Sequence, residues 1–217
     1  MSAVRPFGTS RELPGEPVDY QQLLTPEFVR GLPWDTGRGT GAMWWFIYSE
    51  TMIFVGLFFS YFYLANHSQS WPPEQSPAIT LPLIIAAILL VSCGVLAWGQ
   101  RALVAGSRGS ARLALVVCLL CGAAYIWLEV LSIERSLRIV TPQQDSYGSI
   151  FYTILTVHGA HLVVGMLLMA YALLLPLEPT DAPPHRAYYN GLLYWYFSTF
   201  VWLVVLCCMY LAPRLYR

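Results

Sequence analysis

The chain has 217 residues and a formal net charge of +0 at pH 7, with 57% hydrophobic and only 11% charged residues. Because soluble proteins average about 25% charged residues, this composition excludes an ordinary soluble domain and indicates an integral membrane protein. The balanced charge gives no reason to expect a nucleic-acid partner.

Residues 1–42 are polar, rich in Pro and Gly, and contain no apolar run long enough to span a membrane. Their acidic residues argue against a mitochondrial transit peptide, and the missing apolar core argues against a cleaved secretory signal. We therefore expect residues 1–42 to form a polar cytoplasmic segment and residues 43–217 to form one transmembrane domain.

Five apolar runs follow, each long enough to cross a bilayer as a helix of about 20 residues. The links between them are short and contain Pro or Gly, so consecutive helices should be antiparallel neighbours. The predicted fold is an all-α membrane protein, a bundle of five transmembrane helices. The predicted spans are 43–65, 80–104, 112–135, 149–175 and 190–212.

The distribution of arginine predicts the orientation of the bundle, because cytoplasmic segments of membrane proteins carry an excess of basic residues. Eight arginines fall on the side of the N-terminus and four on the other side, so we expect the N-terminus inside and the C-terminus outside. The eight are Arg5, Arg11, Arg30, Arg38, Arg101, Arg108, Arg112 and Arg186, and the four are Arg135, Arg138, Arg214 and Arg217.

Glu50 lies inside the first predicted span, where an ionised carboxylate costs about 2.5–3.5 kcal/mol even on lenient insertion scales. It is about seven residues, or roughly 10 Å, from the start of the helix, too deep for its short side chain to reach the interface comfortably. It is either a functional protonatable carboxyl, paired with a lipid headgroup or a neighbouring helix, or a neutral hydrogen-bonded acid that fixes packing. The residues alone leave both interpretations open.

Glu129 lies near the end of the third predicted span and has no arginine on its own helix face, so its partner must come from another helix. Glu134 is different, because it stands four residues before Arg138 at the helix end. An interfacial ion pair between these two side chains explains it.

His158 and His161 are three residues apart and share one face of the fourth predicted helix. A heme with two axial histidines needs them on facing segments, and the remaining histidines, His67 and His185, fall in links. This argues against a b-type cytochrome. A metal site completed by one of the buried glutamates is a second alternative, and hydrogen bonding between helices by neutral imidazoles is the favoured interpretation.

Four stretches, taken together with their spacing, resemble subunit III of the heme–copper cytochrome c and quinol oxidases. They are WFIYSETMIFVGLFFSYFY (45–63) with Glu50, WPP (71–73), SYGSIFYTILTVHGAHLVVG (146–165) with its HGxH, and YWYFSTFVW (194–202). Glu129 also falls where this family carries a helix glutamate. Because nothing before residue 43 could span a membrane, the chain is similar to the five-helix bacterial form.

The last helix departs from the family pattern at two positions. Tyr196 stands where the family usually has His, and Thr199 stands where it usually has Asp. The polar contacts of those two residues are therefore not carried over, and a divergent branch is indicated.

The resemblance implies a non-catalytic subunit of a terminal oxidase in the bacterial cytoplasmic (inner) membrane, with no catalytic, metal-binding or cofactor-binding residue of its own. Heme and copper would lie in its partners, the catalytic subunit I and the copper-bearing subunit II. The chain would bind phospholipid in a cleft and support proton uptake and turnover stability in aerobic respiration. Glu50 would be the buried protonatable group, and Glu129, His158 and His161 the polar network of the lipid cleft.

Three other functions remain open. The first is the companion subunit of a nitric oxide reductase, which shares this fold. The second is an independent proton or small-ion carrier that uses Glu50 and Glu129, although no inverted repeat supports it. The third is a membrane metalloenzyme built on His158 and His161, which would require stoichiometric metal.

Overall fold

The computed structural model describes residues 38–68, 71, 78–142, 146–175 and 183–215. Residues 39–217 form one compact unit. The polar segment predicted over residues 1–42 lies almost entirely outside the described residues, so its cytoplasmic location stays a prediction.

The described residues are helical and contain no strand, which confirms the predicted all-α fold. Among them, five stretches are long and apolar enough to cross a membrane, as the sequence predicts. In the last stretch, three helical segments follow one another without a break. The elements are α3 (Arg38–His67), α4 (Thr80–Val104), α5 (Arg108–Leu137), α6 (Ser146–Leu174), α7 (Pro183–Val205), the π-helix η1 (Leu206–Leu211) and α8 (Ala212–Leu215).

Helix α4 begins at the predicted residue 80, and the other four spans begin earlier than hydropathy predicts. Helix α3 starts at Arg38 rather than at residue 43, and α7 starts at Pro183 rather than at residue 190. Proline fits the first turn of a helix because the N–H that it lacks has no partner there. Hydropathy predicts only the apolar part of each helix. The backbone hydrogen bonds of the helix continue into the polar residues next to that part.

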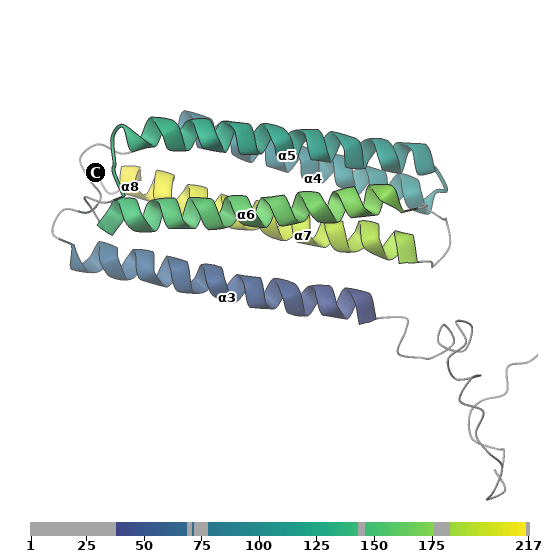
Figure 1. Ribbon diagram of the computed structural model, residues 1–217, viewed down its shortest axis with the longest axis horizontal. Coiled ribbons are helices and arrows are strands. Elements are labelled where there is room, and N and C mark those ends of the chain that lie inside the picture. The colour runs from purple at the N-terminus through teal and green to yellow at the C-terminus, as the bar shows by residue number, and fades with distance from the viewer. Residues whose placement is uncertain (1–37, 69–70, 72–77, 143–145, 176–182, 216–217) are drawn as a thin grey trace, which may run out of the picture. The chain divides into compact units, whose positions relative to one another are not determined.

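Helices α4, α5, α6 and α7 form a closed set of neighbours, in which α4 contacts α5 and α7, and α6 contacts α5 and α7 (Figure 1). Gly99 permits the close approach of α4 and α5, because a Cβ atom there would overlap Ala114 and the Tyr188 hydroxyl. Gly106, with φ of +84°, adopts the left-handed conformation in the turn between the two helices.

Helix α3 packs on this set through large side chains and is the least buried of the five spans. Phe46 stacks on Tyr194 of α7, and Phe54 lies against Phe197 of the same helix. The Tyr61 hydroxyl donates a hydrogen bond to the carbonyl of Cys208 in η1. One face of α3 therefore meets the bundle at intervals of about two turns, and its opposite face is exposed.

Candidate functional site

The buried carboxyl of the first span pairs with the second histidine of the HGxH motif. Glu50 Oε2 of α3 contacts His161 Nε2 of α6 as a short hydrogen bond or ion pair. The side chains are 16% and 11% exposed, so both are largely shielded. A largely shielded carboxyl is thus matched with a proton-binding partner on a neighbouring helix.

The other ring nitrogen of His161 settles how many protons this pair holds. His161 Nδ1 lies 2.6 Å from the carbonyl oxygen of Val157, which can only accept, so Nδ1 carries a hydrogen. The contact between Nε2 and Glu50 then needs one proton, either on the carboxyl or on the imidazole. In both arrangements the two side chains together carry no net charge, so one proton suffices to link α3 and α6 through this contact.

His158 belongs to a separate chain of hydrogen bonds. The Tyr125 hydroxyl of α5 donates to His158 Nδ1 at 2.7 Å, and His158 Nε2 donates to the carbonyl of Ser198 in α7 at 3.0 Å. Because the carbonyl can only accept, Nε2 carries the hydrogen and Nδ1 of the neutral ring accepts. His158 is fully buried and ties three helices together.

An aromatic side chain lies next to both histidines. The ring of Phe54 is centred 4.8 Å from the His161 ring and 6.4 Å from the His158 ring. The two imidazoles therefore share an aromatic neighbour, while their hydrogen bonds run to different helices.

Glu129 is 5% exposed and lies beside Tyr125, one turn earlier on the buried face of α5. Its carboxyl also faces Gly159 of α6, where an added Cβ atom would come within 2.7 Å of Oε2. Among the described residues, its Oε1 atom has no hydrogen-bond partner. The polar neighbour of this carboxyl is thus Tyr125 of its own helix, and α6 brings against it Gly159, which has no side chain.

Residues 33–213 match the family model of cytochrome c oxidase subunit III. This chain belongs to the cytochrome c oxidase subunit III family. The family that the four sequence stretches indicate is thereby confirmed.

Curated relatives support the assignment. The chain is 32% identical over 175 residues to cytochrome c oxidase subunit 3 of Trichophyton rubrum and 30% identical over 175 residues to that of Emericella nidulans. Each match covers 76% of this chain and 64% of the relative's length. The match to cytochrome c oxidase subunit 3 of Gallus gallus is 29% identical over 201 residues and covers 88% of this chain and 73% of the relative.

Within the described residues, the hydrogen bonds of these polar residues fall into two groups. His161 joins Glu50, whereas His158 joins Tyr125 next to Glu129. Within the described part of the chain, no group of three or more His, Cys, Asp or Glu side chains is arranged to hold a metal ion.

Glu134 and Arg138 are both exposed at the end of α5. They lie at the helix boundary where the sequence places them. Their ion pair stays a prediction.

The two positions that depart from the family pattern meet the same residue of α4. Cys93 Sγ lies 3.3 Å from the Thr199 hydroxyl, and the Tyr196 hydroxyl lies 3.4 Å from the Cys93 carbonyl oxygen. Sequence reasoning did not connect these three residues, because a cysteine in an apolar run gives no sign of its neighbours. The departures thus form a local set of contacts between α4 and α7.

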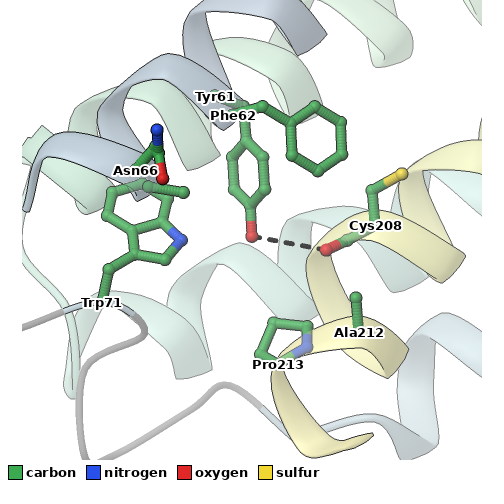
Figure 2. Close-up of a pocket in the computed structure, with 8 residues that line it drawn as sticks. Tyr61, Phe62, Asn66, Trp71, Cys208, Ala212 and Pro213 are labelled. Carbon is green, nitrogen blue, oxygen red and sulfur yellow. Dashed lines mark hydrogen bonds between the residues drawn. The ribbon is translucent and has the colours of Figure 1, made fainter. Parts of the chain in front are cut away.

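A pocket of about 660 Å³ opens between the end of α3 and the end of the last span. Figure 2 shows Trp71 beside Tyr61, and their rings make an edge-to-face contact with centres 5.2 Å apart, while Pro213 and Ala212 line the pocket from the last span. The lining is mainly apolar, with Asn66 as a polar exception. The network residues Glu129 and His158 do not line this pocket.

Proposed function

We propose that this chain is the non-catalytic subunit III of a heme–copper terminal oxidase in a bacterial cytoplasmic membrane. It packs on the catalytic subunit I, in a complex that also contains the copper-bearing subunit II, and it carries no redox centre of its own. Membership of the subunit III family and five apolar spans support this function.

The observation that carries the proposal is the contact between the Glu50 carboxyl and the His161 imidazole. The pair lies within the apolar part of α3 and α6, and a proton that passes between its oxygen and its nitrogen creates no net charge. Such a group stores a proton at low cost where an isolated charge would be expensive. This suits a subunit that supports proton uptake by its partner and stabilises the complex during turnover.

The pocket beside α3 is the proposed site for phospholipid. Its volume and apolar lining suit an acyl chain, and Trp71 and Asn66 lie beside the end of α3, where a membrane-spanning helix would reach the interface region. Tryptophan is favoured at that depth because its ring is apolar and its N–H is polar. A lipid held here would fill the gap between α3 and η1.

Copurification tests the function. The chain, carrying an affinity tag, is extracted from membranes in a mild detergent, and a reduced-minus-oxidised spectrum is recorded for everything that copurifies. We expect heme bands together with a larger polytopic subunit that consumes oxygen when supplied with an electron donor. A complex that reduces nitric oxide but not oxygen would replace this proposal with the reductase companion.

The control for detergent damage is chemical cross-linking before extraction. A colourless chain that cross-links to no heme protein in intact membranes would contradict the proposal. It would favour the independent proton carrier.

A further inference from the structure

The buried face of α5 changes from apolar to polar along its length. Tyr125, Glu129, Ser132 and Ser136 follow one another at steps of four, three and four residues, so they lie on one helix face. All four side chains are buried. The same face carries Ala111, Leu115 and Cys118 in the first half of the helix.

This polar stripe ends at a small cavity. The cavity has a volume of about 230 Å³ and is lined by Ser132, Arg135 and Ser136 of α5, by Ile139, and by the start of α4 around Thr80. The wall is mixed, with hydroxyl groups and a guanidinium group among apolar side chains, and the volume is enough for several water molecules, since each water occupies about 30 Å³ in the liquid. Ser132 belongs both to the cavity wall and to the buried stripe.

Two buried oxygen atoms next to Ser132 need hydrogen-bond partners. Within the described residues, neither Glu129 Oε1 nor the Tyr210 hydroxyl of η1 makes a hydrogen bond of good geometry. Ser132 and Glu129 are both polar neighbours of Tyr210. Buried polar groups are almost always paired, by ordered water where protein atoms do not serve.

The hydrogen-bond direction at Tyr125 restricts the state of Glu129. While the fully buried His158 ring is neutral and donates through Nε2, its Nδ1 takes the only hydroxyl hydrogen of Tyr125, and the Tyr125 oxygen then offers only lone pairs to the carboxyl of Glu129. An ionised carboxylate would face those lone pairs with no hydrogen between them. A neutral carboxylic acid resolves this conflict, because it donates to Tyr125 or to a bridging water.

We propose that a file of ordered water molecules runs from the cavity at the end of α5, past Ser132 and Tyr210, to a neutral Glu129 that exchanges its proton with solvent through this file. In each exchange one proton passes from the carboxyl to the nearest water while another returns, so the carboxyl stays neutral and no net charge moves. This site is distinct from the Glu50–His161 pair and does not depend on the function proposed for that pair.

Infrared difference spectroscopy of the intact complex, purified through a tag on this chain, tests the proposal. Glu129→Gln identifies the carbonyl stretch of the protonated acid as the band that this variant loses. Glu129→Asp keeps a carboxyl and should shift that band, which covers the case in which the Gln variant does not assemble. In the unmodified complex we expect the band to move promptly when H₂O is replaced by D₂O.

Ser132→Val narrows the file where it meets the cavity, and Ser60→Val, on the exposed face of α3, is the matched control. We expect Ser132→Val to slow the exchange of the Glu129 band by about tenfold or more, and Ser60→Val to leave it unchanged. The proposal fails if no band responds to either Glu129 variant, because Glu129 is then ionised. It also fails if Ser132→Val leaves the exchange rate as it was.

Discussion

The contact between Glu50 and His161 needs one proton. Removing that proton tests whether Glu50 has a functional role or only fixes packing. Glu50→Gln keeps a hydrogen bond, since the amide N–H can donate to His161 Nε2, but it removes the exchangeable proton. We expect the complex to assemble with its stability changed by about 1 kcal/mol or less, and to lose activity earlier during sustained turnover. Heme content per chain and the time course of acceptor consumption measure the two effects.

Glu134→Gln is the control for that experiment, because this carboxyl is exposed at the end of α5. It should change neither assembly nor the time course. If Glu50→Gln abolishes assembly while Glu134→Gln does not, Glu50 serves packing and the proton-uptake interpretation is wrong.

His158 is expected to matter for stability alone. His158→Ala leaves the Tyr125 hydroxyl and the Ser198 carbonyl without their partner, at about 1–3 kcal/mol for each buried group. The thermal unfolding temperature of the detergent-solubilised complex should fall clearly. His67→Ala, at the exposed end of α3, should leave it nearly unchanged.

Metal analysis of the same samples distinguishes a hydrogen-bonding role of His158 from a metal-binding role in a metalloenzyme. We expect the metal content attributable to this chain to be the same in the His158→Ala variant and in the unmodified protein. A metal ion that leaves with His158 would refute the hydrogen-bonding role.

His158 and His161 show which part of the site can be predicted from the sequence. A spacing of three residues puts His158 and His161 on one helix face, yet about 60° of rotation still separates them. That rotation directs one ring to α5 and α7 and the other to α3. The sequence predicts that Glu50, Glu129 and the histidines are the important polar groups, but pairing them requires knowing which helices are neighbours.

At the scale of elements, the contact between α4 and α5 depends on Gly99. Gly99→Ala would place a Cβ atom against Ala114 and Tyr188, and overpacking of this kind costs about 1–3 kcal/mol. We expect a lower unfolding temperature and weaker retention in the complex. The measurement is a thermal melt of the purified complex followed by chain-specific detection.

Gly94→Ala on the same helix is the matched variant, because a Cβ atom there meets nothing within 4 Å. It should be neutral or stabilising by up to about 1 kcal/mol, since alanine is the better helix former. Equal unfolding temperatures for the two variants would mean that α4 and α5 do not pack closely at Gly99.

The five spans could be predicted because each is a long apolar run, whereas the π-helix η1 could not be predicted. The sequence nevertheless contains the residue that explains the π-helix. Pro213 lacks an N–H, so in the π-helical pattern of bonds from residue i to i+5 the Cys208 carbonyl has no backbone donor. The Tyr61 hydroxyl of α3 supplies that hydrogen bond at 3.3 Å. The sequence marks the interruption, but the partner that compensates for it lies 147 residues away.

At the scale of the whole molecule, the orientation in the membrane decides what the α5 cavity can exchange with. The cavity lies where α5 ends and α4 begins, so it opens on the same side as the end of α3 and the end of α8. The arginine distribution predicts that this side faces away from the cytoplasm. Protons would then reach Glu129 from the outer side of the membrane. Glu129 would therefore have no part in proton uptake from the cytoplasm.

Two exposed serines on opposite sides of the bundle test the orientation. Ser68 follows α3, and Ser107 lies in the turn between α4 and α5. A membrane-impermeant maleimide should label Ser68→Cys in intact spheroplasts, and should label Ser107→Cys only after the membrane is permeabilised. The unmodified chain, with its native cysteines, sets the background. The reverse pattern would place the N-terminus outside and open the α5 cavity to the cytoplasm, so that Glu129 would become a candidate for proton uptake alongside Glu50.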